Sequence, residues 1–233
     1  MAPSLASSRT AARGLAAFVV VASCFRAAAA NEGFSGVSVG VAGKGFVVVA
    51  ADDTHRRGLV SFRSARDGVP LVDESLLLAC VGDRGESDRF AALLRENLAA
   101  YAHLAGAAAA PRAAAHFARR ELADRRRRGG GLPQLRVLLG SRGDDGAARV
   151  HWIDETGAAA ELPYAAHGVG AALVLGHLDG AYDADMSRDA AVDLVAACLD
   201  VLRRRYALNL DAATIKVLDG AGCETIPWAP PPA

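Results

Sequence analysis

The chain has 233 residues, of which 52% are hydrophobic and 22% charged, and its formal net charge at pH 7 is zero. This length and apolar content are enough to bury the core of one domain, and a zero net charge gives no overall basic field for nucleic acid. The four cysteines form no C-x-x-C pair, so neither a disulfide framework nor a zinc spacing is present, and we expect no metal and no cofactor.

Residues 1–32 form a leader-like extension that we set apart from the fold. Residues 1–31 contain no Asp or Glu, and an apolar run from Leu15 to Phe25 precedes the small residues Ala27–Ala30. This pattern resembles a secretory signal peptide. An organelle transit peptide and sequence translated from a mistaken start site are equal alternatives. The run is too short to span a bilayer, so no membrane anchor is predicted.

The first ordered element expected is a hairpin over Val37–Asp52. Valines alternate with small or polar residues in Val37–Val41, which predicts a strand with one buried face. Phe46–Ala51 is continuously apolar, which predicts a strand covered on both faces. Gly43–Gly45 can supply the positive φ of a tight turn. The hairpin therefore places Asp52 at the end of an inner strand.

The sequence of the middle of the chain predicts a pair of strands followed by two helices. Apolar residues recur at helical spacing after Glu86, and Pro111 is a favourable first residue for a second helix. The expected elements are a loop at Asp53–Asp67 with one strand at Leu59–Phe62, strands at Pro70–Val72 and Ser75–Val81, a helix from Glu86, and a helix from Pro111 through the arginines Arg125–Arg128 to Gly129–Gly131.

The sequence of the last third of the chain predicts three strands, then two helices and a final strand. The Gly143–Gly146 turn is a strong hairpin signal, and Ser187 is a plausible helix N-cap. The expected elements are strands at Leu135–Leu139, Ala148–Ile153 and Ala159–Leu162, helices at Gly168–Tyr182 and Ser187–Tyr206, a strand at Thr214–Leu218, and a disordered proline-rich tail at Pro227–Ala233.

This order of elements favours an α+β fold of four layers. Two antiparallel sheets packed face to face, each covered on its outer side by a pair of helices, accommodate it best. The domain is expected over residues 33–226, between the leader at 1–32 and the tail at 227–233.

Three local motifs are weak on their own. Gly36–Gly40 matches G-x-S-x-G, but Ser38 lies inside a predicted strand instead of on a strand-to-helix turn. Gly43–Gly45 lacks the remaining residues of a phosphate loop. His167 is the most interesting of six histidines, yet a single histidine at a predicted helix start is more often structural than catalytic.

Seven longer motifs become specific through their order and spacing. They are Gly40–Asp52, Leu78–Asp88, Tyr101, Ala115–Asp124, Trp152–Asp154, Pro163–Ala171 and Tyr206–Leu210. As a set, over roughly Gly36 to Ile226, they resemble proteasome β-type subunits, and within that family they favour the non-catalytic type-2 group. The resemblance implies the αββα sandwich of the N-terminal nucleophile (Ntn) hydrolases.

In active members of the family, an N-terminal threonine attacks the peptide carbonyl, assisted by its own amine, an acid and a lysine. The resemblance places Gly36 at the nucleophile position, where it has no side chain to attack with, and keeps Asp52 as a vestigial acid. The remaining family positions fall at or near Gly68 for the lysine, at Val169 for the serine of the G-S-G turn, and at Tyr206 and Asn209 for a later acid and serine. The resemblance thus implies no catalytic residue, and gives structural roles to Asp52, Gly82, Gly85, His167, Gly168 and Gly170.

The implied function is architectural. The chain is expected to be a non-enzymatic β subunit of the proteasome core particle, in the cytoplasm and nucleus, supporting ubiquitin-dependent protein degradation. Its expected partners are other β subunits of its ring, the α ring and the opposing β ring, with no nucleic acid and no membrane. One alternative is an active threonine or serine endopeptidase subunit matured before Ser35 or Ser38. Another is a diverged binding or scaffold protein outside the proteasome, in an organelle if the leader is real.

Overall fold

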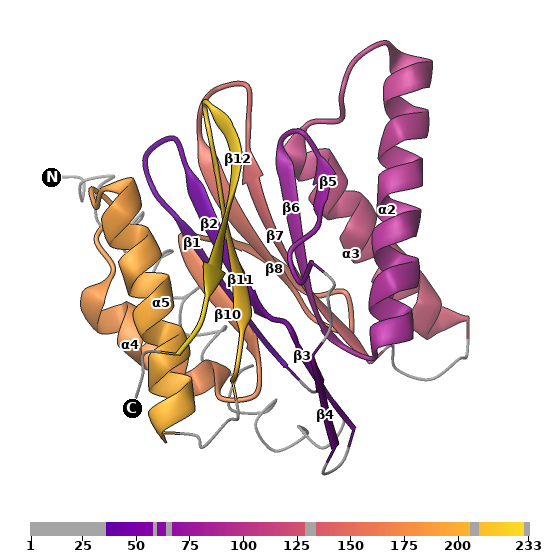
Figure 1. Ribbon diagram of the computed structural model, residues 1–233. Coiled ribbons are helices and arrows are strands. Elements are labelled where there is room, and N and C mark those ends of the chain that lie inside the picture. Colours follow the sequence, from indigo (N-terminus) through magenta and orange to yellow (C-terminus); the bar gives the residue numbers. More distant parts are fainter. Residues whose placement is uncertain (1–35, 58–59, 64–66, 129–133, 206–209, 231–233) are drawn as a thin grey trace, which may run out of the picture.

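The computed structural model describes residues 36–57, 60–63, 67–128, 134–205 and 210–230. Two five-stranded antiparallel sheets lie face to face at its centre. Helices α4 (Ala171–Ala181) and α5 (Arg188–Arg205) cover the outer side of one sheet, and α2 (Arg84–Ala105) and α3 (Pro111–Arg127) cover the other, as Figure 1 shows. The predicted four-layer α+β sandwich is therefore confirmed.

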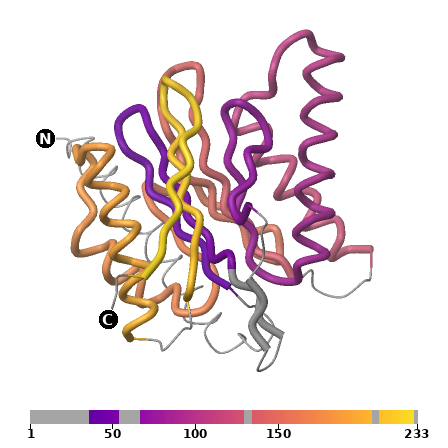
Figure 2. The backbone as a smooth tube through the Cα atoms, in the orientation of Figure 1, coloured from indigo at the N-terminus to yellow at the C-terminus, as the bar shows by residue number. Residues whose placement is uncertain are grey.

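The first sheet has the strand order β10-β1-β2-β11-β12, and all its neighbours are antiparallel. In Figure 2 the chain returns to this sheet from its far end, so that the C-terminal β11 lies beside the N-terminal β2. The strands are β1 (Val37–Ala42), β2 (Val47–Asp52), β10 (Tyr164–Gly168), β11 (Ala213–Asp219) and β12 (Gly222–Trp228).

The second sheet is a meander with the order β5-β6-β7-β8-β9. Its outer face packs on α2 and α3 through an apolar cluster that includes Phe90, Leu94 and Leu139. A separate two-stranded hairpin, β3 with β4, continues beyond β2. The strands are β3 (Thr54–Arg57), β4 (Val60–Arg63), β5 (Leu71–Asp73), β6 (Leu76–Gly82), β7 (Leu135–Arg142), β8 (Ala148–Ile153) and β9 (Ala159–Leu162).

The two sheets are closely packed against each other. A Cβ atom at Gly40 of β1 would lie 2.7 Å from Leu138 of β7, and one at Gly140 of β7 would lie 2.4 Å from Val49 of β2. Each glycine therefore makes room for an apolar side chain of the opposite sheet. The predicted double burial of β2 is confirmed, whereas the single buried face predicted for β1 is wrong, because all six of its residues are buried.

Most predicted elements are present, with ends shifted by a few residues. Helix α2 begins at Arg84 instead of Glu86, and its N-cap Asp83 accepts a hydrogen bond from the Glu86 amide at 2.9 Å. The predicted N-cap of α5 is confirmed, because the Ala190 amide donates to the Ser187 hydroxyl at 3.2 Å. The predicted helix boundaries at Gly129–Gly131 and Tyr206 lie outside the described residues.

Three expectations differ from the structure. The Asp53–Asp67 segment contains two strands, β3 and β4, instead of one at Leu59–Phe62. The helix expected from Gly168 begins at Ala171, and the residues before it form β10, so that His167 lies on a strand instead of at a helix start. Pro227 and Trp228, expected in a disordered tail, form the end of β12 against β11.

The glycine at position 82 has a conformation that other residues rarely adopt. Gly82 ends β6 with φ +140°, and a Cβ atom there would lie 1.9 Å from the backbone oxygen of Gln134. We expect Gly82→Ala to lower the free energy of unfolding by about 2 kcal/mol or more, because backbone strain and a backbone clash add together. Urea denaturation of the full chain, followed by circular dichroism, measures the loss.

Gly176 provides the matched control within the same chain. It lies in α4, is exposed, and has no atom within 4 Å of the Cβ position. Alanine there should raise stability by about 0.5–1 kcal/mol, because glycine is a poor residue in a helix interior. Equal effects of the two substitutions would contradict the structural reading of Gly82.

Candidate functional site

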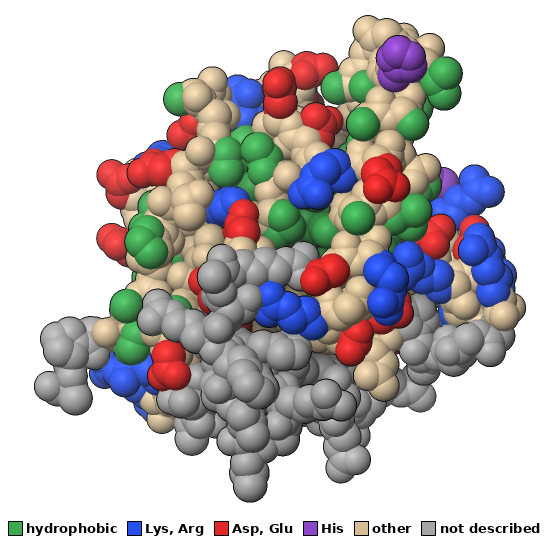
Figure 3. Space-filling view, turned by 45° about the vertical axis from the view of Figure 1, so that its right-hand side comes forward, with side chains coloured by type: hydrophobic (Ala, Val, Ile, Leu, Met, Phe, Trp, Pro, Cys, Tyr) green, Lys and Arg blue, Asp and Glu red, His purple; other side chains and the backbone are tan. Residues whose placement is uncertain are grey.

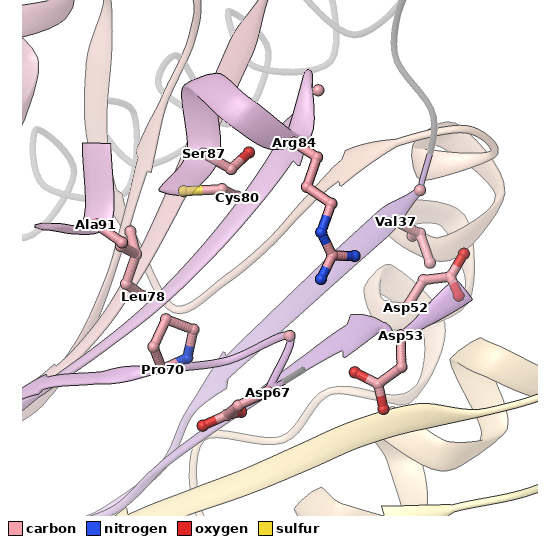
Figure 4. A pocket seen from close by; sticks show the side chains of 13 residues that line it. Val37, Asp52, Asp53, Asp67, Pro70, Leu78, Cys80, Arg84, Ser87 and Ala91 are labelled. Atoms are coloured by element: carbon pink, nitrogen blue, oxygen red, sulfur yellow. The ribbon is translucent and has the colours of Figure 1, made fainter. Parts of the chain in front are cut away.

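A pocket of about 90 Å³ opens where both sheets end near the start of α2. Five segments meet there: the start of β1, the end of β2, the turn before β5, the end of β6 and the first turns of α2, as Figure 4 shows. The lining residues are Gly36, Val37, Asp52, Asp53, Asp67, Gly68, Pro70, Leu78, Cys80, Gly82, Arg84, Ser87 and Ala91.

The position of Gly36 is fixed through backbone contacts. Its carbonyl accepts a hydrogen bond from the Val169 amide at 3.1 Å, and its φ is +98°. A Cβ atom at Gly168 would lie 2.2 Å from the Gly36 oxygen, so this close approach requires glycine at position 168. No side-chain atom of Gly36 is needed to hold the start of β1 at the pocket.

Two carboxylates stand side by side at the end of β2. Asp52 is the last residue of that strand, and the next residue, Asp53, accepts a hydrogen bond from the Thr214 hydroxyl at 2.7 Å. Burial raises the pKa of Asp53, the hydrogen bonds from Thr214 and from the Gly68 amide oppose this rise, and the charges of Asp52 and Asp67 add to it. Three carboxyl groups, those of Asp52, Asp53 and Asp67, therefore lie close enough at the end of β2 to influence one another.

The third pocket carboxylate, Asp67, is tied to the first sheet. It accepts a hydrogen bond from the Val69 amide at 3.0 Å and forms an ion pair with the buried Lys216 of β11. The following residue, Gly68, faces a crowded space, because a Cβ atom there would lie 2.6 Å from the Asp53 carboxylate. A side chain at position 68 would have to displace Asp53.

Arg84 is the only cationic side chain among the described residues that line the pocket. It is the first residue of α2, and in Figure 4 its guanidinium extends across the pocket toward Asp52 and Asp53.

The lining contains two side chains of nucleophilic type, a hydroxyl and a thiol. Ser87 donates its hydroxyl hydrogen bond to the Asp83 carbonyl at 2.9 Å, and Cys80 is half-buried. Neither a histidine nor a lysine is among the described lining residues to take a proton from them. Gly36 at the start of β1 adds no side chain to this set of acids, one cation, one hydroxyl and one thiol.

His167 lies in the seam, away from the pocket lining. It is buried, stacks on Trp152 at 4.8 Å between ring centroids, and its Nε2 is hydrogen-bonded to the Val137 carbonyl at 3.2 Å. Burial, with a smaller contribution from the charge of Arg136, lowers the pKa of His167 to about 3. The ring is neutral at physiological pH. Ser38, its cross-strand neighbour, is also fully buried.

The structure brings together four of the positions that the sequence singled out, namely Gly36, Asp52, Gly68 and Gly82. Gly85 lies in the first turn of α2, and Gly170 caps α4 with φ +77°, both outside the lining. Val169 contacts Gly36 through its backbone amide only. Tyr206 and Asn209 lie outside the described residues.

Sequence reasoning missed the five other charged, hydroxyl or thiol side chains of the pocket: Asp53, Asp67, Cys80, Arg84 and Ser87. Only Asp53 carried a local signal, as the neighbour of Asp52 at a strand end. The others join the pocket because segments distant in sequence meet there.

The described residues contain no group of three or more His, Cys, Asp or Glu side chains arranged to hold a metal ion. Within the described part of the chain, no helix has the length and apolar character that crossing a bilayer requires.

Two helix-covered antiparallel sheets with a pocket at the ends of their inner strands define an αββα sandwich of the Ntn-hydrolase type. The model of the proteasome subunit family matches residues 34–218, and the chain belongs to that family, among its β subunits.

Curated relatives agree with this assignment. Proteasome subunit beta type-2-A of Arabidopsis thaliana is 28% identical over 81% of this chain and 92% of its own length. Proteasome subunit beta type-2 of Oryza sativa subsp. japonica is 30% identical over 79% of this chain and 86% of its own length. Proteasome subunit beta type-4 of Saccharomyces cerevisiae is 26% identical over 82% of this chain and 96% of its own length.

The buried His167 makes the stability of the chain depend on pH. Its pKa is about 3 in the folded chain, whereas a histidine in an unfolded chain titrates near 6.5, so the unfolded chain takes up the proton first as pH falls. We expect this residue to cost about 1 kcal/mol of stability per pH unit below about 6.5, and His167→Gln to reduce that slope. Urea unfolding at several pH values between about 7 and 4 measures both slopes.

Trp152→Phe serves as the control, because it keeps an aromatic ring against His167 and leaves the titrating group in place. Its stability should be lower at every pH while the slope stays that of the wild type. Identical slopes for wild type and His167→Gln would contradict a buried neutral histidine.

Proposed function

We propose that this chain is a non-catalytic, structural β subunit of the proteasome core particle. The observation that carries the proposal is the residue at the start of β1: Gly36 lines the pocket beside Asp52, where active members of the family need a nucleophilic side chain. A glycine has no group that could attack a peptide carbonyl.

The surroundings of Gly68 support the same conclusion. The family resemblance puts a lysine at or near this position, but the space that its side chain would enter is taken by the Asp53 carboxylate. The pocket's cations come instead from Arg84, which lines it, and from Lys216, which is paired with Asp67. Neither of them occupies position 68, where the family resemblance puts the lysine.

An architectural role needs surfaces for neighbouring subunits. The C-terminal end of α2 projects beyond the sheets in Figure 1 and carries Tyr101 and Leu104, which are 52% and 86% exposed. In the described part of the face shown in Figure 3, charged side chains of both signs are scattered around apolar ones. An apolar end within a polar surface fits a subunit that is partly covered on assembly. Its proposed neighbours are β subunits of the same ring, the α ring and the opposing β ring, in the cytoplasm and nucleus.

The alternative of an active subunit requires a serine exposed by cleavage. Ser38 lies within β1, is fully buried, and pairs through its backbone with both Ala51 and His167. Cleavage before it would remove the first residue of a central strand and leave the hydroxyl in the seam. A chain that begins at Ser35 is the remaining version of this alternative, and the mature N-terminus decides it.

The assembly proposal predicts that the chain co-migrates with other proteasome subunits in native fractionation. An affinity tag placed after the C-terminal residue should recover β and α subunits in constant ratio, in a particle many times the mass of this chain. A Leu104→Glu variant should lower the recovered fraction, because it places a charge on the exposed apolar end of α2.

Leu173 of α4 is 42% exposed, and Leu173→Glu is the control variant. It tests whether any change from an exposed leucine to an acid lowers the recovered fraction. Recovery of the tagged wild-type chain only as a free monomer would contradict the ring assignment and favour a scaffold role outside the proteasome.

The proposal of inactivity predicts that a peptide epoxyketone or vinyl sulfone, which labels catalytic N-terminal threonines, leaves this chain unmodified in the intact particle. Catalytic β subunits of the same particle provide the positive control. Intact-mass spectrometry of this chain should show no adduct. A covalent adduct on this chain would establish the active alternative instead. So would a mature N-terminus at Ser35 or Ser38, if peptidase activity appears only when the chain has been cleaved there.

A further inference from the structure

We propose that the exposed face of α3 is a docking surface for an acidic segment of a partner protein. Six exposed basic side chains of this helix form the surface, which we call the basic stripe. They are Arg112, His116, Arg119, Arg120, Arg126 and Arg127. The inference goes beyond the architectural role, because it states the chemistry that a partner must present to this one face.

The basic stripe runs along the side of α3 that faces away from the second sheet. The opposite side of the helix carries the buried residues Ala114, Ala115, Ala118 and Leu122. The stripe residues recur at helical spacing from Arg112 to Arg127, so they follow one another along the exposed side. This span is about 22 Å long, a length that an extended peptide of about seven residues covers.

The helix itself accounts for only part of this charge. Residues 111–128 contain seven arginines and two acidic residues, although the chain as a whole is neutral. Cations in the last turn of a helix are favourable, which accounts for the run Arg125–Arg128 but not for Arg112, Arg119 and Arg120 further from the end. Helix α5 ends in a similar run, Arg203–Arg205, yet residues 188–205 balance four arginines with three acidic residues. The surplus of arginine is therefore particular to α3.

Two carboxylates of the chain already contact the basic stripe. Glu161 of β9 accepts a hydrogen bond on each of its two oxygens from Arg112, at 3.0 and 3.2 Å. Asp124 forms ion pairs with both Arg120 and Arg127. Paired N–H groups directed at a carboxylate are the geometry in which arginine binds acids most strongly. These contacts within the chain show that the stripe can hold carboxylates.

The surface also keeps donors for carboxylates of another molecule. Arg119 donates its Nε hydrogen to the Gly157 carbonyl at 3.0 Å, and its two terminal nitrogens have no hydrogen bond to the described part of the chain. The side chains of Arg126 and of the neighbouring Arg128 have neither a hydrogen bond nor an ion pair within that part. Exposed guanidinium groups that outnumber the nearby acids are complementary to an acidic ligand.

The chemistry of the surface favours an acidic peptide segment over a nucleic acid. Proteins that bind single strands combine positive charge with aromatic side chains on which the bases stack. None of the exposed large hydrophobic side chains of the described residues lies on α3; they are Leu71, Tyr101, Leu104 and Leu173. The carboxylates of Asp124 and Glu161 would also repel a continuous row of phosphates.

The test is binding of a fluorescently labelled glutamate peptide of about seven residues to the full chain, measured by anisotropy. The wild-type chain should bind it saturably at low salt, and the affinity should fall about tenfold when NaCl is raised from about 50 to about 300 mM, because salt screens exposed charges. A glutamine peptide of equal length, which has the same backbone without the charge, should not bind.

Two matched variants locate the binding surface. Arg119→Gln/Arg120→Gln/Arg126→Gln should weaken binding of the glutamate peptide about tenfold or more, because three guanidinium groups of the stripe are lost. Arg203→Gln/Arg204→Gln/Arg205→Gln removes the same charge from the end of α5 and should bind like the wild type. Circular dichroism of each variant shows that it is folded. If the isolated chain does not fold, native material recovered through the C-terminal tag takes its place in the same comparison.

The proposal is overturned if the folded wild-type chain does not bind the glutamate peptide, or if the α5 variant loses as much affinity as the α3 variant. Tighter binding of a thymidine oligonucleotide of similar length would also overturn it, since the partner would then be a nucleic acid. None of these results bears on whether the chain cuts peptides or belongs to a ring, because the readout is the affinity for a short probe.

Discussion

The close packing of the two sheets is the constraint on which the rest of the structure depends. Gly40 accommodates Leu138 across the seam, and Gly140 accommodates Val49, so each sheet contributes one glycine that receives a side chain of the other. Sheets that pack face to face lie about 10 Å apart on average, and glycines allow a closer local approach. Because β2 is held in this seam along its whole length, its last residue, Asp52, reaches the pocket with little freedom of position.

Sequence reasoning recovered the elements whose signals are local. The hairpin over Val37–Asp52, the hairpin around Gly143–Gly146 and helix α3 each combine a clear period with a turn or terminal residue, and each is present. The strand β10 is absent from the predicted elements, and its last residue, Gly168, is predicted to start a helix. The strand β12 has no apolar alternation and contains Pro227, so only its pairing with β11 defines it.

The site was less predictable than the fold, for a physical reason. Gly36, Asp52 and Gly68 could be placed through the family resemblance, yet their acidic and cationic neighbours come from segments that meet only in the folded chain. Asp53 illustrates this. In the sequence it is one more polar residue after a strand, whereas in the structure its carboxylate fills the space beside Gly68 and bonds to Thr214 across the sheet. Spacing along a chain does not reveal which side chain will take such a space.

The contacts that preserve the shape of the pocket are independent of any catalytic side chain. Position 36 is held by its backbone carbonyl, which accepts from the Val169 amide, and by the missing Cβ atom of Gly168. Loss of a hydroxyl at position 36 would leave both contacts intact, so the strand start and the pocket wall remain where an active site would need them. One of the pocket carboxylates, Asp67, is neutralised within the chain by its ion pair with Lys216 of β11. The wall of the pocket thus depends on backbone geometry and on this ion pair, and not on which side chain stands at position 36.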